Sequence, residues 1–194
     1  MTAQARADWL KARQKGIGGS DIAAIVGLNP FKTPMQVWES KVHPVQDDEQ
    51  SEPAYWGNTL EEVVAKEYAK RTGRKVQRVN TQMQHKDFDF VLANIDRAVV
   101  NPNIAGRVYW TGDRLTTDRI LECKTANGFA VKKWGESGSD YVPDEYLVQC
   151  QWYLGVTGAS VCDLAVLIGG QDFRIYTIER DDDLIGDLLV QGAA

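Results

Sequence analysis

The chain has 194 residues, of which 43% are hydrophobic and 25% charged, and its formal net charge is −5. This length suits one hydrophobic core, so we expect a single domain over residues 1–194. The acidic balance argues against a protein that coats nucleic acid through a broad basic surface. It does not argue against an enzyme of nucleic acid that holds metal ions with carboxylates.

Cysteine and histidine usage excludes several kinds of site. Cys123, Cys150 and Cys162 form no CxxC pair, and His43 and His85 are far apart in the sequence. A zinc site or a disulfide framework is therefore not expected, and reducing cytosol fits this composition. No stretch approaches the roughly 20 apolar residues needed to cross a bilayer, and the first residues lack the apolar core of a signal peptide. We expect a cytoplasmic protein with no membrane partner.

Amphipathic spacing and capping residues predict four helices in the first part of the chain. They cover residues 3–15, 20–27, 33–41 and 57–73. Ser20 and Asp21 are suitable N-terminal caps for the second helix, and Gly27 and Gly73 are placed to end the second and fourth. The acidic stretch 43–55, which contains two prolines, is predicted to be a mobile surface loop.

The rest of the chain is dominated by short runs of β-branched and aromatic residues, which predict strands. The predicted strands cover residues 75–79, 88–93, 98–100, 104–110, 119–125, 161–168 and 173–178. Helices are predicted at 144–156, ended by Gly158, and at 184–190. This order of elements indicates an α/β fold around one mixed sheet.

The segment RILECKTAN carries the strongest chemical signal. Glu122 and Lys124 are two residues apart on a predicted strand, so their side chains project from the same face. An isolated E-x-K pattern is usually an ordinary solvated ion pair. Asp96, however, ends the apolar run just upstream and is placed to converge with Glu122 across a hairpin. Two carboxylates beside a lysine suit a hard divalent cation and a bound water.

From Trp9 to Ile178 the sequence resembles the PD-(D/E)xK nuclease superfamily, and within it the lambda exonuclease and YqaJ-type viral recombinase nucleases. The resemblance rests on five motifs in the family's order: WLKARQKGIGGSDIAAIVGLNPF, WGNTLEEVVAKEY, LANIDR, LECKT and YLVQCQWYLGVTG. It implies a restriction-endonuclease-like core, in which helices flank a central mixed β-sheet.

The resemblance also implies roles for the residues of the central motifs. Asp96 and Glu122 resemble the metal-binding carboxylates, with the backbone carbonyl of Cys123 as a further ligand. Lys124 resembles the residue that orients the attacking water. The implied cofactor is Mg²⁺, with Mn²⁺ as a substitute, and two ions per active site.

The resemblance also implies roles for five further residues of the quoted motifs. Glu61 resembles a helix-borne acid that serves the metal, and Gln149 resembles the active-site glutamine. Without the resemblance, Glu61 would be a solvent-facing helix glutamate and Gln149 part of a polar stripe. Arg13 and Ser20 resemble a pocket for a 5′-terminal phosphate, where an arginine grips the anion with two donors. Asn94 is a candidate for a further phosphate contact.

The implied activity is that of a metal-dependent 5′-3′ exonuclease, a phosphodiester hydrolase of the alkaline exonuclease type. It would degrade linear double-stranded DNA from 5′-phosphate ends and leave 3′ single-stranded tails for phage-type recombination by single-strand annealing. The resemblance further implies a homotrimeric ring, a single-strand annealing recombinase as partner, and a phage or prophage origin in a bacterial host. The alternatives are a metal-dependent endonuclease of the same fold and a catalytically silent DNA-binding subunit.

The sequence departs from the family's pattern between its two acidic motifs. Ile95 precedes Asp96 where many relatives have proline, and an extra hairpin is expected over 101–117. This insertion brings Asp113 and Asp118 near the motifs as rival carboxylates. We interpret Asp113 as a turn residue beside glycine, and Asp118 is too close to Glu122 along one strand to oppose it.

Overall fold

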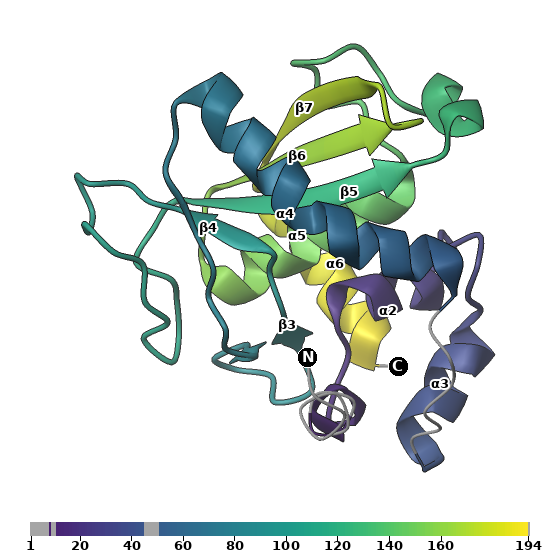
Figure 1. The fold of residues 1–194 in the computed structure, drawn as a ribbon. Helices are drawn as coiled ribbons and strands as arrows, with labels where there is room; N and C mark the ends of the chain where they lie inside the picture. Colours follow the sequence, from purple (N-terminus) through teal and green to yellow (C-terminus); the bar gives the residue numbers. More distant parts are fainter. Residues whose placement is uncertain (1–7, 9–10, 45–50, 194) are drawn as a thin grey trace.

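The computed structural model describes residues 8, 11–44 and 51–193. A five-stranded mixed sheet in the order β1-β4-β5-β6-β7 forms its centre, and β2 and β3 form a separate pair. Helix α4 crosses one face of the sheet, and α5 lies on the other face with α2 and α6 packed against it (Figure 1). The helices are α2 (Gly19–Ile25), α3 (Pro34–Val42), α4 (Glu52–Thr72), α5 (Asp144–Thr157), α6 (Asp182–Ala193) and the 3₁₀ helix η1 (Gly128–Lys133). The strands are β1 (Val76–Gln77), β2 (Met83–Gln84), β3 (Leu92–Ala93), β4 (Arg97–Val99), β5 (Arg119–Ala126), β6 (Val161–Ile168) and β7 (Asp172–Glu179).

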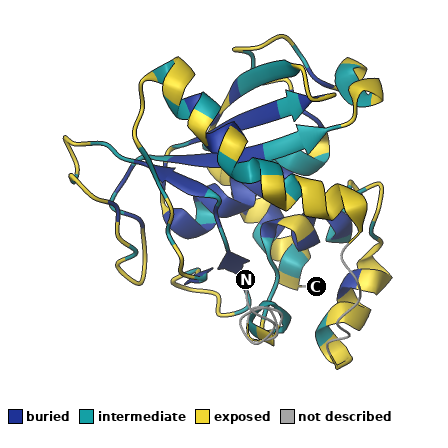
Figure 2. Ribbon diagram, viewed as in Figure 1, coloured by how far each residue is buried: buried dark blue, intermediate teal, exposed yellow. Residues whose placement is uncertain are grey.

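The two long central strands, β5 and β6, are parallel and are joined through η1 and α5. Parallel neighbours need such a crossover, and they are apolar because both faces are covered. Figure 2 shows these strands as the buried centre of the molecule, beneath helices whose outer faces are exposed. The other pairings in this sheet are antiparallel.

Strand β4 pairs with β5 over a short distance, through Arg97 with Leu121 and Ala98 with Ile120. From Glu122 onward, the described residues place no strand on that side of β5. Asp96 lies immediately before β4, at the point where the two strands separate. The open edge of β5 leaves space for a cavity beside the charged residues of this strand.

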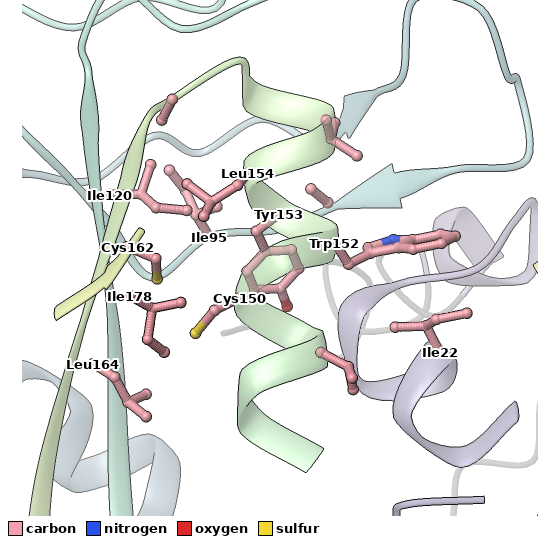
Figure 3. Packing of buried hydrophobic residues seen from close by; sticks show 14 of the residues in the cluster. Ile22, Ile95, Ile120, Cys150, Trp152, Tyr153, Leu154, Cys162, Leu164 and Ile178 are labelled. Atoms are coloured by element: carbon pink, nitrogen blue, oxygen red, sulfur yellow. The ribbon is translucent and has the colours of Figure 1, made fainter. Parts of the chain in front are cut away.

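The core lies on both faces of the sheet and is larger on the α5 side. Figure 3 shows Trp152 extending from α5 toward Ile22 of α2, while Cys150 and Cys162 face each other between α5 and the sheet. The Trp152 indole donates to the carbonyl of Leu92 at 3.0 Å, so its polar group is satisfied. These contacts hold α5 between the sheet and α2.

A buried carboxylate joins α4 to the sheet on the other face. Asp163 of β6 is fully buried and accepts hydrogen bonds from the hydroxyl of Tyr68, from Arg74 at 3.2 Å, from Arg119 at 2.6 Å and from Thr177 at 3.0 Å. Such a charge is tolerated inside a protein only when it is paired and hydrogen-bonded. The network therefore anchors α4, which carries Glu61, to the central strands.

The structure corrects the prediction for residues 43–55. Helix α4 begins at Glu52 rather than near residue 57, with a proline in its first turn. Proline is compatible with that position because the first N–H groups of a helix have no intrahelical partner. Residues 45–50 of the predicted loop lie outside the described residues.

The predicted strand at 104–110 is wrong, and 101–117 forms turns with a single bridge between Trp110 and Leu115 instead of an extended hairpin. The side chain of Gln77 makes the hydrogen bonds with Val108 that a neighbouring strand would otherwise make. Its amide nitrogen donates to the carbonyl of Val108 at 2.7 Å, and its oxygen accepts from the Val108 N–H at 3.0 Å. One side chain thus satisfies both backbone groups of a buried residue.

Smaller differences concern the ends of elements. Helix α2 begins at Gly19 with Gly18 as its N-cap, so Ser20 lies inside the helix and does not cap it. The carboxylate of Asp21 accepts from the N–H of Gly18 at 3.1 Å and performs part of the predicted capping. Of the predicted strand at 88–93 only Leu92–Ala93 forms, and it pairs with β2, which the sequence analysis missed.

The helix predicted at 3–15 is present at residues 8 and 11–14, residue 15 lies in a turn, and residues 3–7, 9 and 10 lie outside the described residues. The helices expected at 33–41, 144–156 and 184–190 and the strands at 119–125, 161–168 and 173–178 are confirmed with small shifts of their ends. No helix in the described ranges is long and apolar enough to cross a membrane.

Candidate active site

A cavity of about 860 Å³ lies between α2, α4 and α5, beside the open edge of β5. It brings together seven of the residues that the sequence analysis singled out. They are Arg13, Ser20, Glu61, Asn94, Asp96, Glu122 and Gln149. These residues come from five separate segments of the chain, so the fold collects them at one place.

Asp96 reaches across the gap between β4 and β5. Its Oδ2 accepts a hydrogen bond from the backbone N–H of Cys123 at 2.8 Å, where a strand carbonyl would otherwise bind. The N–H and C=O groups of one strand residue point to the same side. The carbonyl of Cys123 is therefore directed to the side of Asp96, as the predicted metal ligand requires.

Glu122 is 3% exposed and is held mainly through one of its two carboxylate oxygens. Its Oε1 accepts from Lys124 Nζ at 2.7 Å and from Gln149 Nε2 at 2.8 Å. Gln149 also donates to the hydroxyl of Tyr153 at 3.0 Å. Among the described residues, Glu122 Oε2 is the one buried side-chain nitrogen or oxygen atom without a hydrogen-bond partner. The shared face of Glu122 and Lys124 is thus confirmed, and one carboxylate oxygen is left for a ligand.

The electrostatics of the cavity favour a cation. Burial, reinforced by the neighbouring Glu122 carboxylate, raises the pKa of Asp96 to about 8. Burial also raises the pKa of Glu122, against the opposing effect of Lys124. Burial alone would lower the pKa of Lys124, but the carboxylates of Glu122 and Asp96 raise it above its ordinary value, so the ammonium group keeps its proton.

The donor set fits a hard cation that is only partly enclosed by protein. Within the described residues, no group of three or more His, Cys, Asp and Glu side chains is arranged to hold a metal ion. Asp96, the partnerless oxygen of Glu122 and the Cys123 carbonyl offer oxygen ligands on one side. Mg²⁺ typically binds through one or two carboxylates and completes its octahedron with water and substrate phosphate. The oxygen donors of Asp96, Glu122 and Cys123 therefore fit a hard divalent cation such as Mg²⁺.

Lys124 has a second neighbour that the sequence analysis missed. Its ammonium nitrogen lies 5.2 Å from the ring centroid of Tyr146, and this ring stacks on Trp134 with centroids 5.4 Å apart. Such a cation–π contact restricts where the lysine head can lie. Tyr146 is two helical turns before Tyr153 on α5, but its contact depends on tertiary packing and has no local sequence signal.

Glu61 lines the cavity but is already paired. Its Oε1 accepts from Arg97 Nη1 at 2.5 Å, and Arg78 lies 3.5 Å from the same oxygen. Arg97 is not among the candidates indicated by the sequence, although it directly follows Asp96 in the LANIDR motif. The metal role of Glu61 stays a prediction.

The other end of the cavity carries positive charge. Arg13 Nη2 donates to Ser20 Oγ at 3.1 Å, which confirms that these two residues meet. Asp21, which follows Ser20 and lines the same cavity, has a buried carboxylate that binds Lys32 Nζ at 3.0 Å and Lys41 Nζ at 2.7 Å. Three cations thus gather around one carboxylate. The two lysines were missed because they come from a loop and a helix whose approach to Asp21 is not visible in a local pattern.

Of the remaining candidates, Asn94 lines the cavity, whereas Asp113 and Asp118 do not. Asn94 is half-buried in the cavity wall, two residues before Asp96. Asp113 lies in an exposed turn, where it accepts from Thr111 Oγ1 at 2.5 Å. Asp118 accepts from the amide of Asn101 at 3.0 Å. Neither of these two rival carboxylates is among the residues that line the cavity.

Solved structures of two exonucleases have the same arrangement of elements. The alkaline exonuclease LHK-Exo from Laribacter hongkongensis superposes with a TM-score of 0.72 at 19% identity, covering 96% of this chain and 88% of that chain. A phage-related exonuclease from Haemophilus somnus 129PT superposes with a TM-score of 0.60 at 13% identity, covering 92% and 90%. The predicted restriction-endonuclease-like core with a central mixed sheet is confirmed.

Sequence comparison defines the family. The chain is 44% identical over 183 residues to the protein YqaJ of Bacillus subtilis (strain 168), covering 93% of this chain and 52% of that protein. It therefore spans about half the length of this relative. The model of the YqaJ-like viral recombinase domain matches residues 8–160. That match spans Arg13, Asp96, Glu122, Lys124 and Gln149, and it shows that the chain belongs to the YqaJ-like viral recombinase domain family.

Proposed function

We propose that the chain is a Mg²⁺-dependent deoxyribonuclease that removes nucleotides from the 5′ end of linear double-stranded DNA and leaves a 3′ single-stranded tail. The observation that carries this proposal is that Asp96 and Glu122, whose Oε2 has no hydrogen-bond partner, line one cavity whose other end is cationic. Carboxylates at one end and an anion pocket at the other suit a phosphodiester near a terminal phosphate.

The proposed metal site consists of Asp96, Glu122 and the Cys123 carbonyl. When bound there, Mg²⁺ would polarise the scissile phosphate and stabilise the charge that develops on the leaving oxygen. Lys124 and Gln149 both donate to Oε1 of Glu122, which holds the carboxylate in place and leaves its Oε2 without a hydrogen-bond partner. Lys124 keeps its proton, and in this proposal one of its remaining N–H groups would orient the attacking water. Both residues therefore act by orientation rather than by accepting a proton.

The proposed 5′-phosphate pocket consists of Arg13 and Ser20, with the positive charge of Lys32 and Lys41 behind them. Asp21 offsets part of that charge and holds both ammonium groups in place. A doubly charged terminal phosphate gains more from such a pocket than an internal phosphodiester does. This arrangement favours an exonuclease over an endonuclease, and Asn94 would contact the phosphate chain between the two ends.

Assembly and partners are part of the same proposal. A net charge of −5 provides little basic surface to retain DNA over many turnovers. A closed homotrimeric ring, with a mass of about 65 kDa from chains of 21.7 kDa, would retain the duplex by topology. We further propose a phage or prophage origin, a bacterial cytoplasmic location and a single-strand annealing protein as partner. Light scattering coupled to size exclusion tests the ring, and a monomer that degrades long duplex without dissociating would refute it.

The central experiment follows the degradation of end-labelled linear duplex with and without Mg²⁺. We expect Mg²⁺-dependent release of nucleotides from 5′-phosphorylated ends, slower release from 5′-hydroxyl ends, and no cleavage of closed circular duplex. Glu122→Gln and Lys124→Ala should each abolish cleavage, whereas Asp113→Ala should be tolerated. Arg13→Ala should remove most of the 5′-phosphate preference. Cleavage of circular DNA at a similar rate would identify an endonuclease, and no cleavage of any substrate would support a silent DNA-binding subunit.

A further inference from the structure

The guanidinium of Arg97 is held by several hydrogen bonds beside the candidate metal site. It is 3% exposed and follows Asp96 at the start of β4. Its Nη1 donates to Glu61 Oε1 and to the backbone carbonyl of Asp96, both at 2.5 Å, and its Nη2 donates to Glu62 Oε2 at 2.8 Å. A planar guanidinium suits such simultaneous contacts in a fixed geometry.

Four acidic residues line the cavity, and their contacts differ; Asp21 is paired with Lys32 and Lys41 at the end near Arg13. Glu61 is paired with Arg97 and Glu122 is paired with Lys124. Among the described residues, the Asp96 carboxylate accepts from a backbone N–H and forms no ion pair. Asp96 is therefore the carboxyl group of this cavity without an ion-pair partner among the described residues, and it lies in the same cavity lining as Glu122, which has one partnerless oxygen.

The ion pair between Arg97 and Glu61 affects how many divalent cations the cavity can hold. A second divalent ion near Glu61 would have to displace the guanidinium or share Glu61 with it at close range. Two such cations repel each other strongly in a cavity that is partly shielded from water. Three carboxylates without Arg97, in contrast, would suit two adjacent divalent ions.

We propose that Arg97 is a positioning residue that supplies fixed positive charge at Glu61 and limits the DNA-free chain to one divalent cation, bound at Asp96 and Glu122. This inference rests on the proposed metal-dependent function, and it replaces the expectation of two ions in the chain without DNA. Arg97 would also hold α4 against the start of β4 through Glu61 and Glu62.

The test counts bound Mn²⁺ on the whole chain without DNA, by the loss of the electron paramagnetic resonance signal of free Mn²⁺ during titration. We expect one Mn²⁺ per chain for the wild type and two for Arg97→Gln. Arg97→Lys, which keeps the charge, should bind one. Arg78→Gln is the matched control, because Arg78 contacts the same two glutamates at 3.0 and 3.5 Å from an exposed position, and it should also bind one.

Two Mn²⁺ in the wild type, or one in a folded Arg97→Gln variant, would overturn the inference. If Arg97→Gln fails to fold, as judged by circular dichroism, Glu61→Gln decides. It should still bind one Mn²⁺, with an affinity lowered only because Arg97 loses one of its paired carboxylates. Loss of Mn²⁺ binding would show that Glu61 is a ligand and would overturn the inference. No bound Mn²⁺ in the wild type would refute the proposed metal site itself, a result distinct from a count of two.

Discussion

Replacing Gly19 by alanine tests whether the position of α2 controls the geometry of the carboxylate site. Gly19 is the first residue of α2 and packs directly on α5. A Cβ at this position would lie 2.6 Å from Tyr153 Cε1 and 2.8 Å from Gln149 Cγ. To reach an ordinary contact of 3.4 Å, the Tyr153 ring must move by about 0.8 Å relative to α2.

The expected effect has two parts. Overpacking of this kind destabilises a protein by about 1–3 kcal/mol. Gln149 bonds both Tyr153 and Glu122, so a shift of either residue changes the hydrogen bond that orients the carboxylate. A misplacement of about 1 Å can cost about 100-fold in rate. We therefore expect Gly19→Ala to lower kcat by roughly ten- to hundredfold.

The assay combines urea denaturation with single-turnover cleavage of linear duplex, at a temperature where the variant is folded. Gly18→Ala is the matched control, because its Cβ would lie 3.7 Å from Asp21 Oδ2 and its φ of −95° is accessible to alanine. The control should change stability by less than about 0.5 kcal/mol and keep its rate. Wild-type stability and rate in Gly19→Ala would refute the packing argument, because α2 would then adjust without disturbing Gln149.

Three further perturbations test other parts of the structure. Asp163→Ala should lower the free energy of unfolding, measured by urea denaturation, by about 3–5 kcal/mol. The substitution leaves Arg119 and Arg74 without the buried carboxylate that they bind. A loss below about 1 kcal/mol would contradict this expectation. Gly186→Ala should raise the free energy of unfolding by about 0.5–1 kcal/mol, because Gly186 lies within α6 and an added Cβ meets nothing within 4 Å; a destabilised variant would be inconsistent with that geometry. In EDTA, the melting temperature should fall as pH rises from about 4 to about 8. The reason is that the pKa of Asp96 is raised to about 8 in the folded chain, whereas the unfolded chain loses this proton near 3.8. Above pH 3.8 the folded chain therefore holds a proton that the unfolded chain has lost, and stability falls with rising pH. Asp96→Asn should lessen this fall, and an unchanged pH dependence in that variant would assign it to other groups.

Much of the candidate site follows from local patterns. A strand places Glu122 and Lys124 on one face whatever the rest of the fold, and the structure shows their ion pair at 2.7 Å. The helix with Gln149 and the strands before and after it follow from periodicity and from glycine at the helix end. These features depend on residues close together in the chain, where spacing fixes direction.

Other features depend on pairs that are distant in the sequence, and only the tertiary structure decided them. Arg97 bonds Glu61 from 36 residues away, and Lys41 bonds Asp21 from 20 residues away. The side chain of Gln77 replaces a predicted strand partner of Val108, 31 residues away. Each long polar side chain has several oxygens within reach of its flexible stem, and the packing of α2, α4 and β4 determines which one it meets. The sequence by itself therefore indicated most of the candidate polar residues that meet in the cavity, because their spacing fixes their direction. Only the fold determined which cations meet these carboxylates and which oxygen of Glu122 has no partner.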